Sequence, residues 1–458
     1  MMFLVLFAAS ALSARADEGM WLFNQPPRAT LRERHHFDAT DAWLDHLQRA
    51  SIRFNSGGSG SFISEDGLLI SNHHVGADAL QKVSAKERNI MRDGYYARTL
   101  AEEIKCLDLE LNVLQSIEDV TDRVNAAVPK DADPTAAFAA RRKVIAAIER
   151  ESQDQTGLRS DVVTLWLGGA YHLYRYKRYT DVRIVFAPES QIAFYGGDPD
   201  NFEYPRHDLD ICLFRAYENG KPAKIKDYLR FAPKGAAEGE LIFVSGHPGG
   251  TRRSLTVAEF EDLRDRALPE RLARLKTREV LLANWSARSE ENARRARNAF
   301  FGTQNNRKAI DGRLAGLLDG KMIPAKRAAE QNFKQQLAGK PEFRDALAAY
   351  DKIATATRLE AAQAMRHELL EGAQGLGCES FSLARTLLRA AEERPKRDGE
   401  RLREFSESRR ASLELGLFSD RPIHEDLEIL LLTESLTHLA GQLGADEATA
   451  ARVLAGKS

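Results

Sequence analysis

The character of the sequence changes near residue 255, and this change limits the fold more than any other feature. Before it, short β-branched and aromatic runs at 162–167, 171–176, 182–186 and 241–244 are separated by Gly- and Pro-containing turns. After it, the sequence is rich in Ala, Leu, Glu and Arg and poor in Gly and Pro. Short strands with tight turns predict an antiparallel barrel or sandwich, and the second half predicts a helical domain.

Long amphipathic helices are expected in the second half at 258–300, 326–347, 359–373 and 380–415. The first half also contains two helical patterns. Thr40-Asp41 is expected to cap a short helix that ends at Ala50. Residues 134–153 predict a longer helix, whose apolar stripe would consist of Phe138, Val144, Ile145 and Ile148.

A Gly/Ser-rich stretch leads into a predicted hairpin that ends in two histidines. Its expected strands are 61–64 and 68–71, and Glu65-Asp66-Gly67 is the expected turn because Gly accepts a positive φ. Asn72-His73-His74 follows at once, so we expect both imidazoles on rigid strand or loop backbone. An imidazole titrates near neutral pH, and a fixed one suits a general base. An inert, hydrogen-bonded pair in a loop is the alternative.

An acid in a second polar segment is the candidate partner of these histidines. The segment begins at Tyr195, is rich in turn residues and runs into an apolar strand at 211–215. Asp210 stands where the loop becomes this strand. Such an acid is either a turn former or the carboxylate that bonds an imidazole Nδ1–H and fixes its tautomer. The order of His before Asp matches the chymotrypsin arrangement.

The chain resembles the S46 family of bacterial dipeptidyl peptidases, which are chymotrypsin-like serine exopeptidases with an added helical domain. The matching motifs keep their order and comprise 17–21, 53–62, 72–74 and 196–210. The resemblance implies a β-barrel plus α fold: an incomplete chymotrypsin-like antiparallel double β-barrel, with a large helical domain that roofs the cleft. The implied activity is release of dipeptides from the free N-terminus of peptides, with no cofactor or metal.

The same resemblance assigns roles to particular residues. His74 would be the general base, Asp210 its orienting acid, and His73 structural. Asn201, together with its neighbour Phe202, would hold the substrate at its α-amine. Asn305 aligns loosely with a second amine-binding asparagine of the family, although an amide on a helix surface is the alternative.

One part of the family's machinery is missing from the sequence. The nucleophilic serine of the family lies downstream in a Gly-Asn-Ser-Gly-Ser-type turn, and no such motif follows Asp210. Ser56, Ser59, Ser61 and Ser245 lie near glycines but are poor replacements, because the first three precede His74 and the last resembles a turn residue. We therefore expect a C-terminally truncated chain that lacks the serine region.

Composition and the N-terminus bear on partners and location. The 458 residues carry 66 Lys plus Arg and 67 Asp plus Glu, so no basic field indicates nucleic acid. The three cysteines are widely spaced, which predicts free thiols. Residues 1–16 are expected to be an export signal, which predicts a periplasmic or secreted protein without a membrane span. The expected domains are then 17–254, the barrel region, and 255–458, the helical cap; the resemblance also suggests a homodimer.

Two other classes of function stay open. His73, His74, His207, Asp208 and Asp210 could supply nitrogen and oxygen ligands to a metal-dependent hydrolase, although such sites sit on bundled helices and these histidines are expected on strand or loop. A non-catalytic module that binds peptide termini is the second alternative. The preferred side chain near the scissile bond cannot be derived from this sequence.

Overall fold

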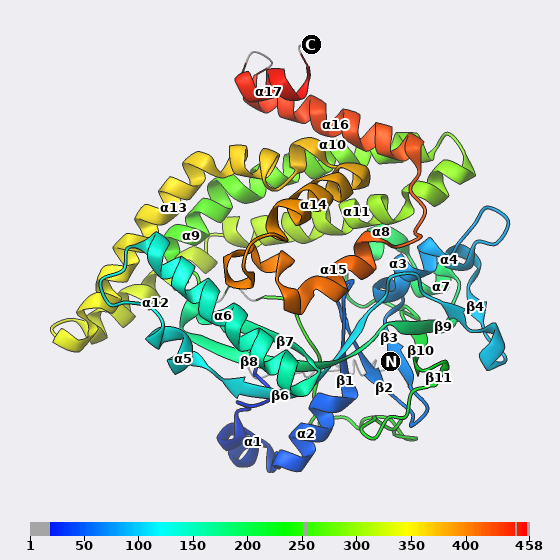
Figure 1. Cartoon of the computed structure of the whole chain (residues 1–458), viewed down its shortest axis with the longest axis horizontal. Coiled ribbons are helices and arrows are strands. Elements are labelled where there is room, and N and C mark those ends of the chain that lie inside the picture. Colours follow the sequence, from blue (N-terminus) through cyan, green and yellow to red (C-terminus); the bar gives the residue numbers. More distant parts are fainter. Residues whose placement is uncertain (1–18, 251, 253, 445–446, 456–458) are drawn as a thin grey trace, which may run out of the picture.

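The chain forms a curved antiparallel sheet with a tier of long helices on one side of it (Figure 1). The computed structural model describes residues 19–250, 252, 254–444 and 447–455. The predicted export signal at 1–16 lies outside these residues. The β-plus-α class predicted from the sequence is confirmed.

The sheet contains all the strands of the described residues, paired in the order β4-β9-β10-β3-β2-β1-β6-β8-β7, with β11 on β10 and β5 on β9. The strand pairings among the described residues are all antiparallel. The strands are β1 Ser51–Phe54, β2 Ser59–Phe62, β3 Leu68–Ser71, β4 Tyr95–Tyr96, β5 Ile104–Lys105, β6 Leu111–Asp119, β7 Arg159–Leu165, β8 Ala170–Tyr179, β9 Asp181–Ala187, β10 Cys212–Glu218 and β11 Lys221–Pro222.

The helices of the first half and of the loops around the sheet are short, with one exception. They are α1 Arg28–His35, α2 Asp41–Ala50, α3 His73–Lys82, α4 Ile90–Asp93, α5 Thr121–Ala126, α6 Pro134–Thr156, α7 Ser190–Ala193 and α8 Gly197–Asp200. The predicted cap of α2 is confirmed, because the Thr40 side chain accepts a hydrogen bond from the Trp43 backbone N–H.

The helices of the second half form the tier above the sheet in Figure 1. They are α9 Val257–Asp262, α10 Leu268–Ser286, α11 Glu290–Leu318, α12 Met322–Leu337, α13 Arg344–Leu370, α14 Glu379–Glu393, α15 Arg410–Leu417, α16 Glu425–Leu443 and α17 Ala448–Val453. No described helix has the length and apolar character that a membrane crossing needs.

The predicted hairpin is present and frames the site. Strands β2 and β3 pair antiparallel, although β2 begins two residues earlier than expected. Gly67 in the turn has a φ of 72°, and a Cβ there would lie 2.7 Å from the Ala216 carbonyl oxygen, so the close approach of β10 requires glycine. Phe62 and Leu69 of this hairpin are buried in the main apolar core with Phe214.

Three predictions in the first half were wrong in detail. The predicted strand 241–244 is not a strand, and Val244 is 98% exposed, because no described strand offers this segment a partner. Phe138 is 64% exposed, since the buried face of α6 instead carries Ala137, Ala146 and Ile148. Strand β7 ends at Leu165, before two exposed residues with positive φ.

The long predicted helices are interrupted where the sequence offers caps or breakers. The helix predicted over 258–300 stops at Ser286, and α11 restarts because the Ser289 side chain accepts from the Asn292 N–H at 3.0 Å. The helix predicted over 326–347 stops before Gly339, whose φ is 77°. The helix predicted over 380–415 is divided by single-turn 3₁₀ segments between α14 and α15.

The second half of the chain returns to the sheet through α15. Fully buried Glu110 accepts a hydrogen bond from the Ser412 hydroxyl at 2.8 Å and pairs with Arg159 at 2.7 Å. These contacts join β7 to α15, so the helical tier and the sheet share a buried polar network. The division into 17–254 and 255–458 stays a prediction.

Candidate active site

The two histidines were predicted to lie at the end of a strand, but they begin helix α3. The first N–H groups of a helix have no partner within the helix. The N-cap residue, Asn72, makes no side-chain cap bond here. Instead the Asp210 carboxylate accepts from the His74 backbone N–H at 3.0 Å, so an acid from a distant segment performs the cap.

The contact expected between His74 and Asp210 is present. His74 Nδ1 lies 2.6 Å from Asp210 Oδ2, and the Asn72 amide donates to the same oxygen at 3.1 Å. Asn72 also donates to the Asp210 backbone carbonyl at 3.1 Å. The His74 side chain is 56% exposed and that of Asp210 27%. The carboxylate is therefore fixed by three donors, while the outer edge of the imidazole stays accessible.

Electrostatics keep the Asp210 carboxylate charged and the His73 imidazole neutral. Burial opposes ionisation of Asp210, but hydrogen bonds from the His74 ring and backbone outweigh it and hold the pKa of this carboxyl below its usual value. Burial, only partly opposed by Asp210, lowers the pKa of His73 to about 4. A buried neutral imidazole agrees with the structural role expected for His73.

Asn201 and Asn305 meet although they lie in different halves of the chain. The Asn201 side-chain N–H₂ donates to Asn305 Oδ1 at 3.1 Å, and Asn201 itself is only 6% exposed. Arg206 Nη1 donates to Asn201 Oδ1 at 3.0 Å, which fixes the orientation of the amide. Phe202, next in the chain, is 61% exposed with a φ of 65°.

Helix α11, which carries Asn305, makes further contacts with the segment around Asn201. Phe301 packs edge-on against Phe194, with ring centroids 5.0 Å apart. Arg307 pairs with Asp198 at 2.9 Å, and Lys308 donates to the Asp198 carbonyl at 2.5 Å. The polar loop before Asp210 is thus held to the helical tier through α11.

No described serine is hydrogen-bonded to His74. The Ser59 hydroxyl accepts from the His247 backbone N–H at 2.7 Å, and Ser245 lies 3.0 Å from the Ser51 hydroxyl. Both side chains are used in joining the 245–247 segment to strands β1 and β2. They do not complete a nucleophile–base pair with His74.

The described residues contain no group of three or more His, Cys, Asp or Glu side chains that could hold a metal ion. The argument that these histidines lie on strand or loop was wrong, because they start a helix. The two imidazoles also have different surroundings. His74 is hydrogen-bonded to Asp210, whereas the Nε2 of His73 is buried and has no hydrogen-bond partner.

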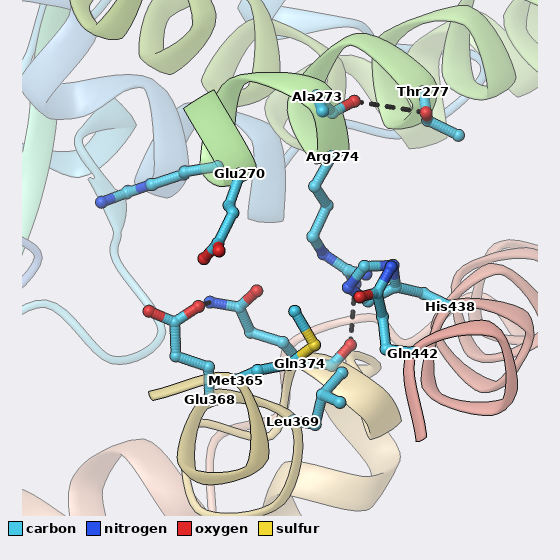
Figure 2. A pocket seen from close by; sticks show the side chains of 11 residues that line it. Glu270, Ala273, Arg274, Thr277, Met365, Glu368, Leu369, Gln374, His438 and Gln442 are labelled. Atoms are coloured by element: carbon cyan, nitrogen blue, oxygen red, sulfur yellow. Dashed lines mark hydrogen bonds between the residues drawn. The ribbon is translucent and has the colours of Figure 1, made fainter. Parts of the chain in front are cut away.

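Two adjoining pockets lie away from this site, in the helical tier. The smaller has a volume of about 320 Å³, and Figure 2 shows Arg274 of α10 reaching across it towards His438 and Gln442 of α16. The larger, of about 680 Å³, shares Arg274 and His438 with it. None of the predicted site residues lines either pocket, so chemistry is assigned to the His74–Asp210 region.

Sequence reasoning missed two members of the site. Asn72 was noted only as part of a motif, although its amide holds the carboxylate of Asp210. Arg206 also went unrecognised, and its neighbourhood within the 196–210 motif was the available signal. The three cysteines are free, as predicted, and buried.

A histidine whose Nδ1 is held by a carboxylate has the geometry that the acid–base pair of a hydrolytic triad requires. The sequence profile of Peptidase S46 matches residues 16–458, so the chain belongs to the peptidase S46 family. It is 30% identical over 358 residues to dipeptidyl-peptidase 7 of Phocaeicola vulgatus, covering 73% of this chain and 50% of that protein. It is 34% identical over 284 residues to the Asp/Glu-specific dipeptidyl-peptidase of Porphyromonas gingivalis, covering 57% and 39%.

Solved structures support the fold. DPP11 of Porphyromonas endodontalis in complex with the dipeptide Arg-Glu superposes with a TM-score of 0.72 at 24% identity, covering 96% of this chain and 66% of that one. The complex with Arg-Asp gives a TM-score of 0.74 at 23% identity, covering 94% and 64%. The chain spans about half the length of the first curated relative that it matches.

Proposed function

We propose that this protein is a serine-type dipeptidyl aminopeptidase that removes dipeptides from the free N-terminus of peptides. The observation that carries the proposal is the His74–Asp210 contact of 2.6 Å in a chain of the S46 family. His74 would take the proton of a serine nucleophile through Nε2 and return it to the leaving amine. Asp210 would hold the ring in the required tautomer and stabilise the imidazolium.

The asparagine pair is proposed as the site that measures two residues from the substrate's N-terminus. An α-ammonium that leaves water must meet acceptors, because an unpaired buried charge is costly. Each amide oxygen has two lone pairs; the hydrogen bond from Arg206 uses one on Asn201, and the bond from Asn201 uses one on Asn305. The remaining lone pairs can accept from an ammonium, and exposed Phe202 would contact the first residue.

The nucleophile is proposed to be a serine outside the described residues, since none of the described serines pairs with His74. Export by residues 1–16 and a periplasmic or secreted location are proposed with it from the N-terminal sequence, and a homodimer from the resemblance alone. A second candidate is a peptide-binding role without catalysis. The lack of a described serine at His74 favours it, and the DNA downstream of codon 458 would distinguish the two through a Gly-x-Ser-Gly coding stretch.

The amine site can be tested in a completed enzyme, in which these residues are followed by the serine-bearing region of an S46 relative. Asn201→Ala should lower kcat/KM for free-amine dipeptidyl substrates by about 1–3 kcal/mol in transition-state terms, because an acceptor of the ammonium is lost. Exposed Glu203→Ala, in the same loop, is the matched control. Unchanged cleavage by Asn201→Ala would show that the amide does not anchor the substrate.

A further inference from the structure

One cation on α11, Arg297, has no partner among the residues that the structure describes. Arg297 is partly buried, yet no hydrogen bond, ion pair or ring contact is found for it among the described residues. Burial lowers the pKa of its guanidinium, and no carboxylate raises it again. None of its nitrogens is both fully buried and without a hydrogen-bond partner, so the guanidinium keeps some access to solvent. An arginine kept partly buried without a counter-ion is costly unless a ligand supplies the charge.

The position of Arg297 on α11 links it to the active site. It belongs to a stripe of residues, Arg294, Arg297, Phe301, Asn305 and Lys308, that recur at helical spacing on one face. Arg294 donates to the Ser84 carbonyl at 3.1 Å, just beyond α3. Phe301, Asn305 and Lys308 contact the polar loop before Asp210. Every member except Arg297 therefore has a protein partner across this face.

Arg297 follows Arg294 by about one turn of α11, so along this helix it lies between the residue that contacts Ser84, just beyond α3, and Asn305 of the asparagine pair. Its guanidinium also contributes, after burial, to the lowered pKa of buried His73.

The spacing between Arg297 and Asn305 along α11 would put Arg297 beyond the bond to be cut. Arg297 and Asn305 stand at i and i+8 of α11, which separates them by about 12 Å along the helix axis. An extended peptide advances about 3.3 Å per residue, so this span corresponds to roughly three to four residues from the α-ammonium. The scissile bond follows the second residue. For a peptide that runs along α11 from Asn305 towards the start of the helix, the guanidinium would be level with the leaving peptide.

We propose that Arg297 is a specificity-determining residue that binds a carboxylate of the leaving peptide, so that acidic or short free-acid peptides are preferred. The carboxylate has two sources: the C-terminus of a tri- or tetrapeptide, or an acidic side chain just after the cut. Arginine suits either, because its planar fork binds a carboxylate with two parallel hydrogen bonds. This inference rests on the proposed function, since the direction of the peptide follows from the amine site.

Binding to the 458-residue chain tests the proposal without catalysis. Isothermal titration would compare a neutral tetrapeptide as the free acid and as the C-terminal amide, and amidated peptides with Glu or Gln at the third position. In the parent protein at least one carboxylate form should bind about tenfold or more tightly than its neutral counterpart. Whichever pair shows the difference identifies the source of the carboxylate.

Variants assign the preference to the guanidinium. Arg297→Met should bring the carboxylate-to-neutral ratio close to one, and Arg297→Lys should retain part of it. Arg313→Met removes the same charge from an exposed position of α11 and should leave the ratio unchanged. Unfolding curves for each variant check that the fold is kept. The inference is overturned if no pair shows a preference in the parent protein, or if the ratio survives in Arg297→Met.

The amine site is tested separately in the same experiment. Acetylation of the peptide N-terminus should weaken binding in the parent and in Arg297→Met alike. If acetylation has no effect, the proposed amine site fails, whatever the carboxylate ratio. If acetylation weakens binding but the ratio does not depend on Arg297, only the present inference fails.

Discussion

Replacing Asp210 with alanine should remove both the cap of α3 and the support of the His74 ring. The carboxylate accepts from the His74 backbone N–H at 3.0 Å, from the Asn72 amide at 3.1 Å and from the His74 ring at 2.6 Å. Loss of a helix cap costs about 0.5–2 kcal/mol. A hydrogen bond to a charged group is worth about 1.5–3 kcal/mol. Because the His74 side chain is half-exposed, the bond between its ring and Asp210 is expected at the lower end of this range.

The expected loss of unfolding free energy in Asp210→Ala is therefore about 2–3 kcal/mol at pH 7. Asp210→Asn, which keeps one acceptor oxygen, should lose less. Because the folded-state pKa of Asp210 is depressed, its contribution is present above the unfolded pKa and is lost as the pH falls through the folded value. The difference between parent and variant should accordingly be constant from pH 5 to 8 and shrink in more acidic solution.

Urea unfolding measures the total loss of unfolding free energy. Amide hydrogen exchange reports separately on the hydrogen bond that caps α3. The His74 amide has no intrahelical acceptor, so its protection depends on Asp210 and should disappear in Asp210→Ala. Glu203→Ala, an exposed acid of the preceding loop, serves as control. A loss below about 0.5 kcal/mol, the level of an ordinary surface substitution, together with a protected His74 amide, would refute the reasoning.

Three further outcomes are expected. Glu110→Ala should destabilise the protein by about 1–3 kcal/mol in urea unfolding, because it removes one of the two carboxylates that pair with Arg159 and the acceptor of the Ser412 hydroxyl; an effect below about 0.5 kcal/mol would mean that the network is not needed. Between pH 6.5 and about 4 the unfolded chain binds a proton at His73 that the folded protein does not, so stability should fall as the pH is lowered; His73→Gln should remove roughly 3 kcal/mol of the total fall across this range, and an unchanged pH dependence would contradict the burial of a neutral ring. The 458-residue chain alone should not release dipeptides at a meaningful rate, since a triad without its nucleophile keeps little activity; robust release would reveal an unsuspected serine.

Local sequence signals predicted the hairpin and the capped helix α2, because the residues that decide them are neighbours in the chain. The turn glycine Gly67 and the cap residue Thr40 each act within a few residues. The start of α3 could not be predicted in this way. Its cap is the Asp210 carboxylate, which lies 136 positions further along the chain.

Tertiary contacts also decided the other differences. The apolar run at 241–244 has the pattern of a buried strand, but a strand requires a neighbour, and Phe243 instead packs against Trp43 with ring centroids 4.9 Å apart. The asparagine pair was predicted only from resemblance, since nothing local brings Asn201 and Asn305 together. The missing partner of Arg297 is visible only once α11 is placed against α3.

The central claim is that His74, held by Asp210, serves a peptidase that counts two residues from a free N-terminus. Mass spectrometry of the first products released by the completed enzyme tests it most directly. The account predicts that an unblocked peptide yields its N-terminal dipeptide, and that both N-acetylation and His74→Ala abolish this product. Release of single residues, internal cleavage of the acetylated peptide, or full activity in His74→Ala would contradict it.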